Sequence, residues 1–177
     1  GFREDTNFRV ISLARENMAR DAMKLALDYT HTVIDGPPHA EAIARSCIVA
    51  SDLVLLPIEP SGLSTWASDL TVRQVREAQE IKESLKCGFV VSRKIGNTVI
   101  GREIRSMAAD HGIPILKSEI EQRVAYAESL TMGKTIFEWS PGSAAATEIE
   151  NLTNELLELY EQENLPDSAE TQTAANG

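Results

Sequence analysis

The 177-residue chain is 42% apolar and 25% charged, a composition typical of a globular protein with one domain and a substantial core. No apolar run approaches the roughly 20 residues that a membrane-spanning helix needs. The net charge of −10 comes mostly from residues 141–177, which contain eight acidic and no basic residues. The first 140 residues are nearly neutral, with 19 acidic and 17 basic side chains, so the overall acidity does not exclude DNA binding.

Strands are predicted to alternate with helices along most of the chain. Short apolar runs predict strands at residues 8–13, 32–35, 53–58, 89–91 and 114–116. Apolar residues at helical spacing predict the intervening helices at residues 15–27, 40–49, 64–85 and 100–111. Such alternation indicates right-handed crossovers and therefore an α/β fold, in which a mostly parallel sheet carries helices on both faces.

The alternation is predicted to stop after the fifth strand. Two helices follow at 121–130 and 144–163, and the second keeps its apolar residues at helical spacing. Residues 166–177 contain almost no large apolar side chain, which is typical of a disordered segment. We therefore expect one nucleotide-binding domain over residues 1–163 and a disordered acidic and polar tail over 164–177.

Asp35 is the strongest candidate for a functional residue, because it ends an apolar run and is followed by Gly36-Pro37-Pro38. The glycine and the prolines force the chain out of the sheet, which leaves Asp35 at the carboxyl end of a strand. Open α/β sheets bind their ligands at that edge, where a carboxylate can reach Mg²⁺ through water as a Walker B aspartate does. Alternatively, Asp35 caps the next helix.

The sequence that normally accompanies such an aspartate is absent from these residues. A phosphate-binding loop has the pattern G-x-x-x-x-G-K-[ST], which does not occur in the 177 residues. The chain also opens at Gly1 without a methionine. We therefore expect the amino-terminal, phosphate-binding part of the domain to be missing.

Basic residues are concentrated in one short stretch of the otherwise neutral body. They form either a small nucleic-acid patch or a solvated helix face, and they are Arg93, Lys94, Arg102 and Arg105. Arg123, which follows the fifth strand, is equally suited to contacting DNA or nucleotide and to forming a surface salt bridge.

Five segments, taken in order, give the chain a resemblance to a known family. They are Val33–Pro38, Ser51–Ser61, Val90–Lys94, Gln122–Ser129 and Gly133–Glu138. Through these segments, residues 8–162 resemble the ParA-type partition ATPases, which are relatives of the MinD cell-division ATPases with deviant Walker motifs. The small plasmid-type members are the most similar in their spacing. The resemblance implies a P-loop NTPase-like fold, here truncated at its amino terminus.

The resemblance also implies roles for individual residues toward ATP. Asp35 would be the Walker B aspartate that holds Mg²⁺ through water, although many relatives have threonine where this chain has Gly36. The adenine ring would lie between the end of strand 89–91 and the loop after strand 114–116. The candidates to contact the nucleotide are Ser92, Arg93 and the turn formed by Ser118, Glu119 and Ile120.

The resemblance also implies that the protein forms a nucleotide-dependent dimer that binds DNA. The candidate DNA contacts are Lys94, Arg102, Arg105 and Arg123. The loop that would respond to nucleotide near the dimer face consists of Pro60, Ser61, Gly62 and Leu63. In such a family the homodimer binds non-specific DNA, and a ParB-type centromere-binding protein stimulates ATP hydrolysis.

These implications describe a plasmid- or chromosome-partitioning ATPase in the cytoplasm, associated with the nucleoid. Membrane attachment is not expected, because the last helix is acidic instead of basic and amphipathic. The full-length protein is expected to hydrolyse ATP, whereas these 177 residues alone are expected to be inactive. Three alternatives remain open. They are a non-catalytic DNA- or partner-binding module of the same fold, another P-loop enzyme similar to MinD or dethiobiotin synthetase, and a Rossmann-type domain without phosphate chemistry.

Overall fold

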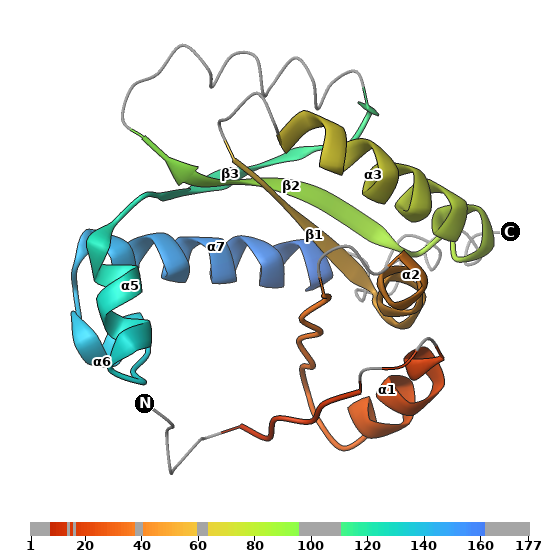
Figure 1. The fold of residues 1–177 in the computed structure, drawn as a ribbon, viewed down its shortest axis with the longest axis horizontal. Helices are drawn as coiled ribbons and strands as arrows, with labels where there is room; N and C mark the ends of the chain where they lie inside the picture. Colours follow the sequence, from red (N-terminus) through yellow and green to blue (C-terminus); the bar gives the residue numbers. More distant parts are fainter. Residues whose placement is uncertain are drawn as a thin grey trace, which may run out of the picture.

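The centre of the molecule is a parallel sheet. The structure, a computed structural model, describes residues 8–13, 15, 17–37, 41–59, 64–95 and 111–161. Within these residues the sheet contains β1 (Leu53–Ile58), β2 (Lys86–Lys94) and β3 (Ile115–Glu121) in the order β1-β2-β3, with every pairing parallel. Helix α3 (Ser64–Ile81) and helix α7 (Ala144–Glu161) lie on opposite sides of the sheet, as Figure 1 shows. The predicted α/β fold with a parallel sheet is confirmed.

The main core lies between the sheet and α3. Because successive side chains of a strand point to opposite faces, Phe89 and Val91 face α3 while Gly88 and Val90 face the other way. Phe89 is only 1% exposed and packs in a cluster with Leu56, Ile58, Val72, Val91 and Ile113. On the opposite face, a Cβ atom at Gly88 would lie 2.5 Å from the Leu116 side chain. Glycine therefore allows β2 and β3 to pack closely there.

Three of the five predicted strands form, and two of these are longer than predicted. The strand at 53–58 has the predicted bounds, whereas those at 89–91 and 114–116 extend to 86–94 and 115–121. The prediction of a turn at Ser118-Glu119-Ile120 is therefore wrong. These polar residues stay in the sheet because β2 continues to pair with them, through Val91↔Glu119 and Lys94↔Glu121.

The strands predicted at 8–13 and 32–35 do not form, and these predictions are wrong for this structure. Both segments run without a ladder, and the described part of β1 pairs with β2 alone. The physical reason is that an apolar run becomes a strand only where a neighbouring strand takes its backbone hydrogen bonds. Val33 is 93% exposed, while Ile34 packs against a small cluster of Met18, Ala22 and Cys47.

The helices confirm most of the predicted elements, with shifted ends. They are α1 (Met18–Ala26), α2 (Glu41–Ala50), α3, α5 (Val124–Thr131) and α7, plus the short α6 (Ile136–Trp139), which was not predicted. Helix α6 begins with a capping box, in which Thr135 accepts the Glu138 N–H and the Glu138 carboxylate accepts the Thr135 N–H. None of the helices in the described part of the chain is both long and apolar enough to cross a bilayer.

Three predicted segments lie outside the described residues. They are the loop 60–63, most of the helix 100–111, and the tail 164–177. Gly112, which directly follows the predicted helix 100–111, has a φ of +60°, the left-handed conformation that favours glycine after a helix end. Arg76 of α3 donates to the carbonyl oxygens of His111 and Gly112, both at 2.8 Å, and so ties this corner to α3.

Candidate functional site

Charged residues from the three strands meet at the carboxyl edge of the sheet. Glu59 follows β1, Arg93 and Lys94 end β2, and Glu119 lies late in β3. Arg93 Nη1 lies 3.1 Å from Glu59 Oε1, and Lys94 forms a close ion pair with Glu119. Adjacent parallel strands present their carboxyl ends on one side, which is where open α/β sheets bind ligands. Among the predicted residues, the structure thus joins Lys94 of β2 to Glu119 of β3, while Arg93 pairs with Glu59, which was not predicted.

The backbone of Arg93 is unusual for a residue in a strand. Its φ is +53°, in the left-handed region that non-glycine residues rarely adopt. The pairing of β2 with β3 shifts between Val91 and Lys94, which accounts for one extra residue on β2 at this point. The bulge turns Arg93 out of the ladder toward Glu59, with a side chain that is 70% exposed. Such local strain is typical of ligand-binding segments.

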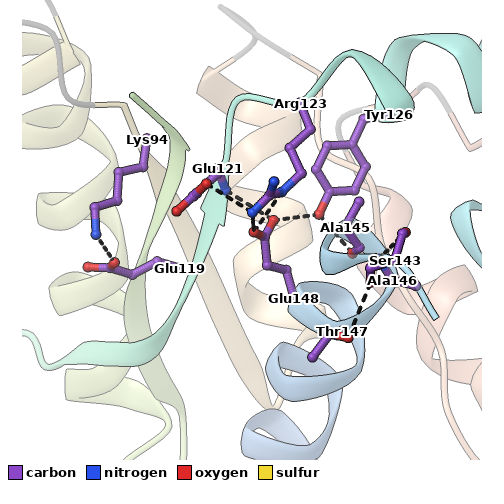
Figure 2. Close-up of polar contacts among 10 residues, drawn as sticks. All are labelled: Lys94, Glu119, Glu121, Arg123, Tyr126, Ser143, Ala145, Ala146, Thr147 and Glu148. Carbon is purple, nitrogen blue, oxygen red and sulfur yellow. Dashed lines mark hydrogen bonds and ion pairs between the residues drawn. The ribbon is translucent and has the colours of Figure 1, made fainter. Parts of the chain in front are cut away.

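A second polar network joins the end of β3 to α5 and α7, and Figure 2 shows it. Arg123 donates to Glu148 from Nε at 2.8 Å and from Nη2 at 2.6 Å, and Nη2 also lies 2.9 Å from Glu121. The hydroxyl of Tyr126 lies 2.9 Å from Glu148 Oε2 and donates to it. Of the two roles predicted for Arg123, the structure shows the salt bridge, while DNA contact stays a prediction.

Glu148 is held at this position by the start of α7. Ser143 caps the helix by accepting the Ala146 N–H at 3.2 Å, which places Glu148 in the second turn facing β3. Burial alone would raise the pKa of Glu148, but hydrogen bonds from Arg123 and Tyr126 outweigh it and lower that pKa below its ordinary value. Burial, together with the hydrogen bond to Glu148, raises the pKa of Tyr126. The network therefore favours an ionised Glu148 and a neutral Tyr126.

Removing the charge of Glu148 is expected to destabilise the protein only at pH values at which Glu148 is ionised. Since its pKa is lower in the folded than in the unfolded chain, its stabilisation is complete above about pH 4.3 and is lost as the pH falls through the folded value. Glu148→Gln should lower the free energy of unfolding by about 1–2 kcal/mol at pH 7. In urea unfolding measurements the difference from the parent should shrink toward pH 3.

Glu150→Gln is the matched control, because Glu150 is exposed on the same helix. It makes the same charge change without touching Arg123. An equal loss of stability in both variants at pH 7 would mean that the overall charge, and not the network, determines the effect.

Asp35 is exposed, and it lies between α1 and α2, outside the three strands whose carboxyl ends form the edge of the sheet. Ile34 anchors its segment to the α1–α2 cluster. A Cβ atom at Gly36 would lie 3.9 Å from Cys47 Sγ, so the chain after Asp35 runs beside that thiol. Burial raises the pKa of the Cys47 thiol, and the carboxylate of Asp35 adds to the rise. Among the described residues no group of three or more His, Cys, Asp or Glu side chains could hold a metal ion. One carboxylate fits a Mg²⁺ that takes its other ligands from water and phosphate.

The structure does not describe all of the predicted site residues. Arg102, Arg105 and the loop 60–63 lie outside the described part of the chain. Conversely, Glu59, Glu148 and Glu155 were not predicted as site residues. A usable signal existed for the last two, since residues seven apart lie on the same face of a helix two turns apart.

A hollow of about 450 Å³ opens between β3 and α7, beside the network. It is lined by polar side chains only, namely Lys117, Ser118, Glu119, Glu121, Glu148 and Asn151. Of the predicted nucleotide contacts, Ser118 and Glu119 therefore border open space.

Comparison with known proteins gives two similarities. No protein-family model matches the chain. Over 138 residues the chain is 28% identical to the "Maintenance of carboxysome distribution protein A" of Halothiobacillus neapolitanus, a match that covers 76% of this chain and 64% of that protein. The structure resembles the crystal structure of the cell division ATPase MinD of Pyrococcus furiosus, with a TM-score of 0.64 and 21% identity.

The chain is shorter than both of these proteins. It spans about 64% of the length of the first, and its likeness to the second covers 82% of this chain and 60% of that one. The structural likeness confirms the P-loop NTPase-like α/β fold. The sequence similarity links the chain to a protein whose name concerns carboxysome distribution, and the structural likeness shows the fold that it shares with MinD.

Proposed function

We propose that this chain is the greater part of an ATPase that positions a cargo inside the cell, as the ParA/MinD family implies. The observation that carries the proposal is the similarity, over 138 residues, to a protein whose name describes the distribution of carboxysomes. The cargo proposed here is plasmid or chromosome DNA, as the partition ATPases imply, and a carboxysome is the other cargo that the relative's name suggests.

The nucleotide is proposed to bind at the carboxyl edge of the sheet. Ser92 and Arg93 would contact its base from β2, and Ser118, Glu119 and Ile120 from β3. The Arg93–Glu59 pair does not oppose this, because an exposed ion pair is worth only about 0–1 kcal/mol. Arg93 can therefore exchange Glu59 for a ligand at little cost. The Lys94–Glu119 pair is more enclosed than the Arg93–Glu59 pair.

The metal would be held by Asp35 through water. Bound Mg²⁺ would polarise the phosphates toward attack by water. The phosphate grip itself is proposed to come from a glycine-rich segment that the 177 residues do not contain. The role of Asp35 is then to orient a hydrated ion.

The proposed working unit is a cytoplasmic, nucleoid-associated homodimer. The loop Pro60, Ser61, Gly62 and Leu63 would respond to nucleotide at the dimer face. The DNA surface would be formed by Lys94, Arg102, Arg105 and Arg123. A ParB-type partner would stimulate hydrolysis and release the DNA.

ATP-dependent DNA binding by the full-length protein tests this function. Reversing two basic residues, in Arg102→Glu with Arg105→Glu, should weaken binding to all DNA sequences by at least about tenfold. The slope of log affinity against log salt should fall by about two, because each lost phosphate contact releases about one fewer counterion. Fluorescence anisotropy with a labelled duplex, with and without ATP, measures both effects.

The matched control reverses Arg20 and Lys24, two exposed residues one turn apart on α1. This pair makes the same charge change on another surface and should leave binding unchanged. DNA binding that does not depend on ATP in the parent protein would count against the switch and favour a non-catalytic binding module.

A further inference from the structure

The outer edge of β3 is closed by side chains instead of a strand. β3 lies at one end of the described sheet, so amides on its outer side have no strand to pair with. Glu155 of α7 accepts the Lys117 N–H at 2.7 Å with one oxygen and the Ser118 N–H at 2.8 Å with the other. Glu148 accepts the Glu121 N–H at 3.2 Å. Two carboxylates of one helix thus take the place of a neighbouring strand.

The amides that Glu155 holds lie in a bulge. Between the pairs Phe89↔Ile115 and Val91↔Glu119, β2 advances by two residues and β3 by four. In a regular strand, consecutive N–H groups point to opposite sides, so two consecutive amides can face one carboxylate only where the strand is distorted. The bulge contains Ser118 and comes immediately before Glu119 and Ile120, and these three residues are the proposed nucleotide contacts of β3.

We propose that Glu155 is a positioning residue, which holds the bulge of β3 and thereby sets where Ser118, Glu119 and Ile120 lie. The assignment of those three residues to the nucleotide rests on the proposed function. The position of Glu155 on the bulge does not, because it follows from the two hydrogen bonds.

Charges around Glu155 and the anchoring of α7 support this role. Burial alone would raise the pKa of Glu155, but its hydrogen bonds to Ser118 and Lys117 and the charge of Lys117 outweigh this and lower it, so the carboxylate is ionised at neutral pH. One turn beyond Glu155, near the carboxyl end of α7, the ammonium group of Lys86 donates to the carbonyl of Leu159. Helix α7 is therefore bonded to both β3 and β2. Because these contacts fix the helix, Glu155 can hold the bulge in place.

Glu155→Gln tests the proposal, because the amide keeps the size of the side chain but turns one acceptor into a donor. That donor then faces an N–H group. In the full-length protein, hydrogen exchange of the Lys117 and Ser118 amides should become about tenfold faster. The discrimination between ATP and GTP, measured as the ratio of their affinities, should also fall, since the strand that contacts the base is no longer held.

Glu158→Gln is the matched control, one turn further along α7 and exposed. It should change neither quantity. If Glu155→Gln does not fold, Glu155→Asp keeps the charge, draws the carboxylate back by one methylene, and should accelerate the same two amides. Unchanged exchange at these amides overturns the proposal, as does faster exchange with an unchanged ATP to GTP ratio. If neither nucleotide binds to the parent protein, the proposed function fails, while the exchange result still decides whether Glu155 holds the bulge.

Discussion

Replacing Phe89 with alanine is expected to lower the free energy of unfolding of the chain by about 3–5 kcal/mol. Phe89 lies in the central strand, is 1% exposed, and packs between both other strands and α3. Its removal leaves a cavity between layers that cannot close without moving β1 or β3. Urea unfolding followed by far-ultraviolet circular dichroism measures the loss.

The control for this prediction is Ile81→Ala. Ile81 ends α3 and is 88% exposed, so its truncation should change stability by less than about 0.5 kcal/mol. If Phe89→Ala unfolds the protein completely, Phe89→Leu gives a smaller loss that can be measured. A loss below about 1 kcal/mol for Phe89→Ala would mean that the site between β2 and α3 collapses freely and is not the main core.

Replacing Asp35 with asparagine is expected to abolish Mg²⁺-dependent ATP hydrolysis in the full-length protein, by at least about 100-fold, while the fold is kept. Asparagine has the shape of aspartate but lacks the charge that orients a hydrated Mg²⁺. Because Asp35 is exposed, its loss should cost little stability. The measurement is phosphate release over a range of Mg²⁺ concentrations, alongside the unfolding midpoint.

Asp28→Asn provides the control for the metal, since it removes a carboxylate exposed shortly before Asp35. It should hydrolyse ATP at the parent rate. Equal rates for Asp35→Asn and the parent would leave Asp35 as a cap of the next helix, and the metal would then have to be held elsewhere.

The sheet shows which local patterns were sufficient for prediction. Leu53–Ile58 was predicted with correct bounds because a run of six apolar residues between a polar start and Glu59 is typical of a strand in a parallel sheet. The helix at 144–161 was recognised from its apolar spacing for the same local reason. The similarity to a MinD structure confirms the fold that these patterns predicted.

The wrong predictions of secondary structure concern segments whose conformation depends on partners far away in the sequence. Residues 32–35 have the composition of a buried strand, yet they do not form one, because no neighbouring strand pairs with them in the described structure. Residues 117–121 have the polar composition of a turn, yet they form a strand, because β2 pairs with one side and the carboxylates of α7 bind the other.

By itself, the sequence determined the α/β class, the strand at 53–58, and the resemblance to the ParA and MinD ATPases, because periodicity and motif order are local properties. Only the tertiary structure decided that Arg123 is held by Glu148, that Arg93 leaves the ladder toward Glu59, and that Glu155 closes the edge of β3. Each of these contacts joins residues 25 to 38 positions apart. Hydrogen bonds between groups so distant depend on how the strands and helices pack, which no pattern along the chain records.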